Sequence, residues 1–150
     1  MPDPALQYTA KAVREAVVSL VDRAFDAEGY AEVDSRVWVA DVPDYAEDPW
    51  CLIEIIDLVP STDAESKDCA AEAVFVNIEL YATEQGTDTP YEAVEALAVQ
   101  VVQRITAPDF SIEGHSVFNT RQNLAEPLSS TGPEQVDLFG RALQYQIDIE

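Results

Sequence analysis

The sequence predicts an α+β fold, a mainly antiparallel β-sheet with two helices packed on one face, in the order α-β-β-β-α-β-β. Two segments repeat apolar residues at helical spacing, and several others alternate apolar and polar residues as half-buried strands do. The hydrophobic fraction of 47% is high enough for a core. No linker, repeat or low-complexity tract divides the 150 residues, so one domain, 1–150, is expected.

The first predicted helix precedes Gly29, a residue placed to end it. Charged side chains such as Arg14 and Asp22 occupy one side. The other side carries the apolar residues at helical spacing: Val13, Val17, Leu20, Val21, Ala24 and Phe25.

Three strand segments follow. Val37 to Val42 is short and apolar, and a turn rich in proline and acids separates it from Trp50 to Leu58. A polar loop, Pro60 to Ala70, leads to the clearest strand. Its residues alternate strictly, with Val74, Val76, Ile78 and Leu80 pointing one way and Phe75, Asn77, Glu79 and Tyr81 the other.

The second predicted helix has a marked beginning. Thr89, Pro90 and Glu92 supply a capping threonine, a proline at the first helical position and the glutamate of a capping box. Pro108 lies just past its end. Its buried stripe is expected to comprise Val94, Leu97, Ala98, Val101 and Ile105.

The remaining third of the chain predicts two more strands. Phe110 to Gln122 is expected as a strand pair or one bent strand that turns near Glu113-Gly114. A second polar loop is expected from Asn123 to Gln135, which contains Pro127. The last strand alternates, with Leu143, Tyr145, Ile147 and Ile149 inward and Gln144, Gln146, Asp148 and Glu150 outward.

Two features indicate a partner. Both polar loops exceed the 2–5 residues usual in hairpins, and long loops on a folded domain serve either as binding surfaces or as plain insertions. Some strands are also apolar on both faces, as at Trp38, Phe75 and Tyr81. Since two helices cover only one face, the second face either meets another subunit or belongs to a partly wrapped core.

The charge of the chain excludes several function classes. Its 29 acidic and 8 basic residues leave a formal charge of −21, and 15 acids but one base, Lys67, lie between Val37 and Gln103. Such a surface repels nucleic acid and anionic membranes. No apolar run reaches the ~20 residues that span a bilayer, and the N-terminus does not resemble a signal peptide. A soluble protein of a reducing cytoplasm is expected.

Residues suited to catalysis are nearly absent. A lone histidine such as His115 is more often a surface or structural residue than a base, and the five glycines form no phosphate loop. Two cysteines 18 positions apart and one histidine do not make a zinc site. Cys51 is expected to be a small hydrophobic residue within a strand, and Cys69 a solvated thiol. No enzymatic activity, and no catalytic, cofactor-binding or metal-binding residue, is predicted.

One acidic cluster imitates a calcium site: Asp41, Asp44, Glu47 and Asp48. Clustered oxygens are what a hard cation needs. However, the spacing is not that of an EF-hand, and clusters arise by chance among 29 acids. A solvated acidic loop is the favoured interpretation.

Taken in order, these elements resemble the tail terminator proteins of tailed viruses, also known as tail completion or head–tail joining proteins. That family has a passage in which a hydrophobic residue and a proline precede a second proline, an aromatic residue and an aliphatic strand. The similar passage here is Val42-Pro43 followed by the segment from Asp48 to Ile55, which includes Pro49 and Trp50. The leading helix, the long loop, the strand around Val74 to Tyr81, the second helix and the last strand also match in order. The resemblance covers about Tyr8 to Glu150, and the sequence departs from the family in its extreme acidity.

The resemblance implies a structural virion protein without enzymatic activity. Such proteins form a ring, typically a hexamer, at the head-proximal end of the tail tube. The ring stops tube polymerisation and joins the tail to the head, and DNA passes through its centre. The implied partners are further copies of this chain, the tail tube protein and a connector or stopper protein. Pro60 to Ala70 is assigned to the tube or lumen side, and an acidic lumen would let DNA slide without binding.

The composition also resembles that of proteins from salt-loving organisms, because lysine is scarce and Asp, Glu, Ala and Val are abundant. At molar salt the Debye length falls to ~3 Å, so a −21 surface becomes tolerable. Two alternative functions stay open. One is another neck component, a stopper or adaptor, or a tail tube subunit, and the other is a small acidic enzyme or metal-binding module.

Overall fold

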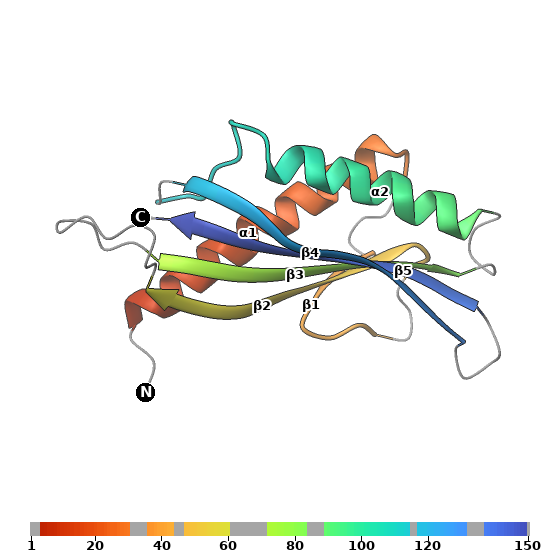
Figure 1. Ribbon diagram of the computed structural model, residues 1–150, viewed down its shortest axis with the longest axis horizontal. Helices are drawn as coiled ribbons and strands as arrows, with labels where there is room; N and C mark the ends of the chain where they lie inside the picture. Colours follow the sequence, from red (N-terminus) through yellow and green to blue (C-terminus); the bar gives the residue numbers. More distant parts are fainter. Residues whose placement is uncertain are drawn as a thin grey trace.

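Two helices lie side by side on one face of a five-stranded sheet (Figure 1). The structure, a computed structural model, describes residues 4–30, 36–43, 47–60, 72–83, 89–114, 117–131 and 137–149. The elements are α1 (Pro4–Ala27), β1 (Val37–Val39), β2 (Trp50–Pro60), β3 (Glu72–Thr83), α2 (Pro90–Ile105), β4 (Val117–Thr131) and β5 (Asp137–Ile149).

The strand order in the sheet is β1-β2-β3-β5-β4. Only the β1–β2 pair is parallel, whereas β2, β3, β5 and β4 pair antiparallel with their neighbours. Strand β5 therefore lies between β3 and β4, although it comes last of the elements in the chain. The predicted α+β class, element order and placement of both helices on one face are confirmed.

The core lies between the helices and the sheet. All six apolar positions expected to face inward from α1 are fully buried, as are the four from β3 and, at 1% exposure or less, the four from β5. Antiparallel packing places Gln100 of α2 beside Glu28, and the amide Nε2 of Gln100 donates to the carboxylate at 3.0 Å. The buried residues of α1, β3 and β5 are those that the helical period of 3.6 and the strand period of 2 predicted, so these periods located the core correctly.

The ends of the helices differ slightly from expectation. Helix α1 begins at Pro4, earlier than the periodic pattern alone defines, and ends just before Gly29, whose φ of +84° suits glycine. Helix α2 begins at Pro90 with Thr89 in the capping position, as predicted. The Thr89 side chain makes no capping hydrogen bond, so that part of the predicted capping box is wrong.

Strand β1 is shorter than predicted, since it ends at Val39 and not at Val42. Ala40 adopts a φ of +69°, in the left-handed region that L-residues rarely occupy, and this turns the chain out of the strand. The Ala40 amide still donates to the Ile53 carbonyl at 3.1 Å. An edge strand of three residues offers little backbone for further pairing.

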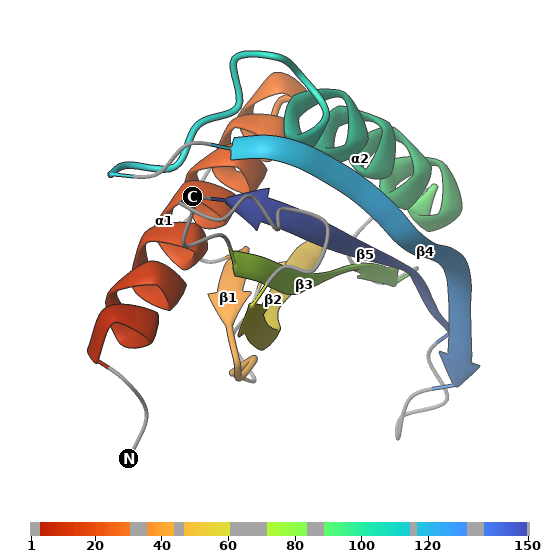
Figure 2. The ribbon, with the colours of Figure 1, turned by 60° about the vertical axis from the view of Figure 1, so that its left-hand side comes forward.

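The loop predicted from Asn123 to Gln135 is wrong for most of its length. Strand β4 continues to Thr131 and pairs with β5 along nearly its whole length. Figure 2 shows that this outermost strand bends strongly along its course. Pro127 fits there because an edge strand has only one neighbour, so a residue without an amide proton is tolerated. The turn at Glu113-Gly114 is confirmed, with a φ of +78° at Gly114.

The burial of Asp148 differs from the prediction that it faces outward from β5. The residue shares the predicted outward face of β5 with Gln144 and Gln146, but it is fully buried. The Gln146 amide Nε2 donates to its Oδ1 at 3.0 Å. Alternation along a strand identifies the face on which a side chain lies, not the depth at which it lies there. Glu150 is outside the described residues.

Gly140 is required by close packing against the ring of Tyr81, its partner across β3 and β5. A Cβ at this position would lie 2.7 and 2.8 Å from Tyr81 Cδ1 and Cε1, and 3.0 Å from the Leu80 carbonyl oxygen. We expect Gly140→Ala to lower the free energy of unfolding by about 1–3 kcal/mol through overpacking. Urea denaturation would measure this. The cost should shrink in a Tyr81→Ala background, and an equal cost in both backgrounds would contradict the argument.

Candidate functional site

The face of the sheet that points away from both helices carries several large side chains, and we call it the open face. Figure 2 shows both helices on the other side of the sheet. The strand registers align the open-face residues of β1, β2, β3 and β5 in rows. The large apolar and aromatic side chains that the structure describes on this face are half-buried, and they are Trp38, Trp50, Leu52, Phe75 and Tyr81.

An ordered network joins the aromatic and polar groups of the open face. Trp50 and Tyr81 stack with their ring centroids 5.7 Å apart. The Tyr81 hydroxyl donates to Glu79 Oε1 at 2.6 Å, and Asn77 Nδ2 donates to Glu79 Oε2 at 3.1 Å. Burial, followed by the hydrogen bond to Glu79, raises the pKa of Tyr81 above its usual value, so this hydroxyl remains a donor at neutral pH.

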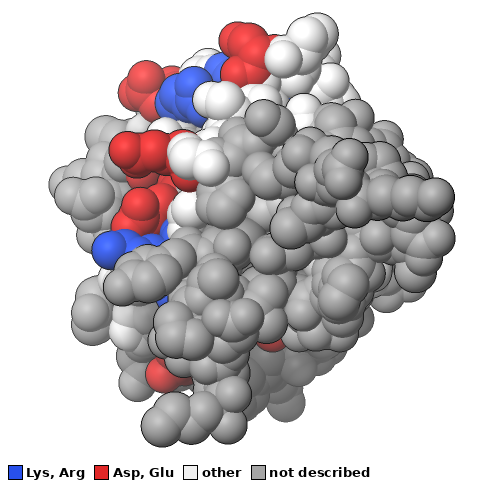
Figure 3. Space-filling view, turned by 90° about the vertical axis from the view of Figure 1, so that its left-hand side faces the viewer, with Lys and Arg blue, Asp and Glu red and all other residues white. Residues whose placement is uncertain are grey.

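The charges described on this face are all negative. Glu54 is exposed, Glu79 is half-buried and Asp148 is fully buried. Figure 3 shows a different side of the molecule, where the described acidic side chains form a column along one flank with a few basic side chains between them. The acids are therefore spread over several surfaces, as whole-surface acidity requires.

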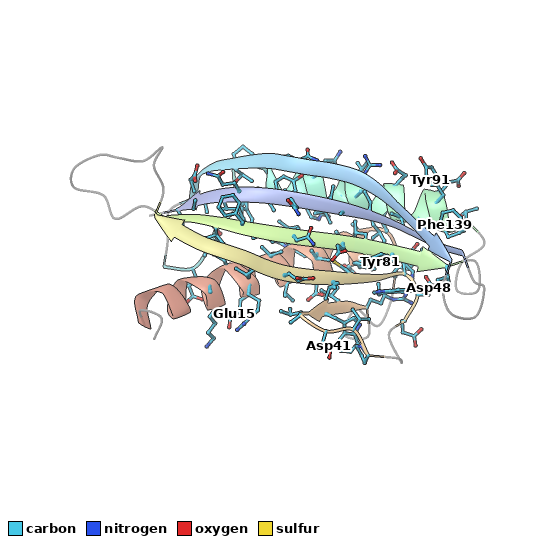
Figure 4. All side chains as sticks on the ribbon, turned by 60° about the horizontal axis from the view of Figure 1, so that its bottom comes forward. Glu15, Asp41, Asp48, Tyr81, Tyr91 and Phe139 are labelled. Carbon is cyan, nitrogen blue, oxygen red and sulfur yellow. The ribbon has the colours of Figure 1, made fainter. Side chains whose placement is uncertain are left out.

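Two described members of the acidic cluster, Asp41 and Asp48, do not share one site. The Asp48 carboxylate faces the end of β3, where it accepts from the Thr83 amide at 3.0 and 3.1 Å and from the Thr83 hydroxyl. Figure 4 shows Asp41 well apart from Asp48, and Asp44 lies outside the described residues. Within the described ranges, no group of three or more His, Cys, Asp or Glu side chains is arranged to hold a metal ion.

Cys51 lies in β2, and its side chain is fully buried in the core. This confirms the prediction that it is a small hydrophobic residue within a strand. Burial, with smaller effects of Glu79 and Asp22, raises the pKa of its thiol well above the usual value. A thiol that stays protonated and shielded is a poor nucleophile. His115, Cys69, Lys67 and the part of the first polar loop from 61 to 70 lie outside the described residues.

A cavity of about 290 Å³ lies between α1 and the C-terminal end of α2, and no sequence motif indicated it. Its lining includes two of the chain's eight basic residues, Arg23 and Arg104. Arg23 Nε donates to the Ser19 carbonyl at 3.4 Å. Arg104 Nε is buried and finds no hydrogen-bond partner among the described residues. Their scarcity in so acidic a chain is the one sequence signal that could have singled them out.

The comparisons with known proteins find a likeness among solved structures. No known family model matches the sequence, and no curated protein matches it. A chain in the solved structure "Virion of native gene transfer agent (GTA) particle" superposes with a TM-score of 0.58 at 15% identity. The match covers 89% of this chain and 93% of that chain.

The likeness is one of fold. It extends over nearly the whole of both chains, so the helix pair and the sheet are shared as one arrangement.

Neither helix described here is long and apolar enough to cross a membrane.

Tyr145 carries a polar group into the core. The residue is fully buried, and its hydroxyl has no hydrogen-bond partner among the described residues. Burial raises the pKa of this hydroxyl to about 12, from a usual value near 10. Below pH 10 the hydroxyl is neutral in both the folded and unfolded states. Between pH 10 and 12 only the unfolded state releases its proton, so the folded state loses stability over this range.

We expect Tyr145→Phe to raise the free energy of unfolding by up to about 1 kcal/mol at neutral pH, because it removes an unpaired buried hydroxyl. The gain should grow between pH 10 and 12. Urea denaturation of wild type and variant across this range would measure both effects. Tyr91→Phe, at an exposed position, is the matched control. A loss of more than 1 kcal/mol in Tyr145→Phe would show that the hydroxyl has a stabilising partner.

Proposed function

We propose that this chain is a structural virion protein of a tailed virus or a related particle, and that it acts as a tail terminator. The observation that carries the proposal is the fold likeness to a chain of a gene transfer agent virion, over 89% of this chain and 93% of that one. In this role, copies of the single domain 1–150 form a ring, a hexamer, at the head-proximal end of the tail. The ring stops tube polymerisation and joins the tail to the head, without enzymatic activity.

The open face supports an assembly role. Stacked aromatic side chains and a carboxylate already engaged by two donors give a surface with fixed side-chain positions, which lowers the entropy cost of association. The described acids that reach solvent on this face, Glu54 and Glu79, are also compatible with a lumen surface. DNA would pass such a surface without binding, because the charged side chains described there are acidic and do not displace phosphate counterions.

The location that follows is the neck of the virion, after assembly in the host cytoplasm. The tail tube protein and a connector or stopper protein are the expected partners, and Pro60 to Ala70 is proposed to face the tube or the lumen. A stopper, an adaptor or a tube subunit is the second candidate, because the fold likeness supports any virion structural protein. The acidity suggests adaptation to high salt.

The experiment that tests this function is electron microscopy of the purified protein at molar salt, with its mass measured by light scattering. Closed rings of uniform size support the terminator role, and open tubes would identify a tube subunit. A strict monomer at every protein concentration would overturn ring formation. Calorimetric titration with calcium and magnesium tests the metal-binding alternative, since only that role predicts tight stoichiometric binding.

A further inference from the structure

Helix α2 presents an exposed apolar surface on a strongly charged molecule. Tyr91 and Val99 are 59% and 52% exposed, and they are two of three large hydrophobic residues exposed among those the structure describes. The third, Val39, is 37% exposed and lies away from α2 on β1. Val99 precedes Gln103 by about one helical turn, and Gln103 lines the cavity that contains Arg23 and Arg104. Val99 is therefore a neighbour, one turn away along α2, of a residue that lines the arginine cavity.

Among the described residues, neither arginine of this cavity forms an ion pair with an acidic side chain. The described ion pairs join Lys11 to Glu15 and Arg141 to Glu95, and neither involves Arg23 or Arg104. Asp109 lines the same cavity without a described ion pair to them. A guanidinium with a buried, unpaired Nε has lost hydration without a compensating hydrogen bond. A carboxylate that entered the cavity would supply a charge-assisted bond, and a guanidinium is shaped to receive it.

The charge around α2 is almost balanced. We count the charges on α2, on the side chains bonded to it and on the cavity lining. They are three arginines (Arg23, Arg104 and Arg141) and four acids (Glu28, Glu92, Glu95 and Asp109). Three positive and four negative charges leave −1 here, against −21 for the whole chain. Two copies can approach each other at this surface with little repulsion, and an acidic chain brings carboxylates to it.

We infer that the outer face of α2 is a docking surface for a second copy of this chain. Tyr91 and Val99 make the apolar contact, and a carboxylate of the second copy enters the cavity between Arg23 and Arg104. The inference rests on the self-assembly proposed above and assigns it to a particular surface. It also explains how so acidic a chain can associate, because the contact joins two arginines that have no described ion pair to another copy's surplus acids.

The test measures self-association by light scattering and sedimentation over a range of protein concentrations at molar salt. We expect Val99→Asp and the pair Arg23→Gln with Arg104→Gln each to weaken association by about tenfold or more. Gln103→Glu should weaken it as well, because it offers the arginines a carboxylate from their own chain. The matched controls lie beside a separate cleft between α1 and β1. Val39→Asp changes the charge by the same amount as Val99→Asp, and Val39→Asp combined with Arg14→Gln lowers the charge by two, as the arginine pair does.

Circular dichroism and thermal unfolding would establish that each variant is folded. Association equal to wild type in Val99→Asp and in the arginine pair would overturn this inference while leaving ring formation intact. Equal weakening in the controls would also overturn it, because a general charge effect would then suffice. If the wild-type chain is monomeric under all conditions, self-assembly and this surface fail together.

Discussion

Transfer from molar salt to dilute buffer is expected to dissociate the proposed ring. Six copies, each of charge −21, would carry six times that charge, −126. The Debye length rises from ~3 Å at 1 M to ~30 Å at 0.01 M, so charges on neighbouring copies that are screened in the first solution repel in the second. The nearly neutral surface of α2 reduces this repulsion locally, but it leaves the rest of each copy strongly acidic.

Light scattering and sedimentation during stepwise dilution of potassium chloride would follow the dissociation. An uncharged osmolyte at matched osmotic strength is the control, because it favours burial of surface without screening charge. If the osmolyte preserves the ring as well as salt does, screening is not the cause. A ring that stays intact in dilute buffer would contradict the prediction and the adaptation to high salt that motivates it.

Replacement of Asp48 by alanine is expected to cause a large loss of stability for a half-buried side chain. Its carboxylate binds the amide and hydroxyl of Thr83 and so fixes the approach to β2 against the end of β3. Arg36 secures the same segment, since its Nη1 donates to the Asp48 carbonyl at 2.7 Å and to the Pro49 carbonyl at 3.3 Å. Hydrogen bonds to a charged group contribute ~1.5–3 kcal/mol, and the unpaired Thr83 amide adds a desolvation cost.

We therefore expect Asp48→Ala to lower the free energy of unfolding by about 2–4 kcal/mol in urea denaturation. Asp48→Asn should lose less, because an amide oxygen can still accept from Thr83. Asp41→Ala, at an exposed position, is the matched control and should stay within ~0.5 kcal/mol of wild type. Losses of similar size at both positions would show that Asp48 acts through general acidity and not through these bonds.

Hydrophobic periodicity predicted the helices and the inner side of the sheet well, because burial imposes a period on the sequence. The apolar residues that the spacing placed inward, within Val13 to Phe25 and within Val74 to Leu80, are buried. Strand β4 gave no such signal. It lies at the edge and pairs with only one neighbour, so its sequence can be polar and contain Pro127 without losing the backbone hydrogen bonds to β5.

The assembly surfaces were only partly predictable. The apolar side chains on the second face of the strands indicated the open face, and its rows of neighbours are now defined by the strand registers. The meeting of Arg23 with Arg104 was not predictable, since 81 positions separate them in the sequence. Only the antiparallel packing of α1 against α2 brings them to one cavity. Likewise, the sequence placed Asp48 in an acidic loop, and only the fold directs it to Thr83.

The position of β5 constrains the order in which the sheet can be completed. Strands β1, β2 and β3 can pair with one another as the ribosome delivers them, but β4 has no neighbour except β5. Until β5 has been synthesised and inserted between β3 and β4, β4 is an unpaired segment and the inner face of α2 lacks part of its packing surface. A chain that has not yet formed β5 therefore cannot present a finished subunit, so association before β5 is in place is disfavoured.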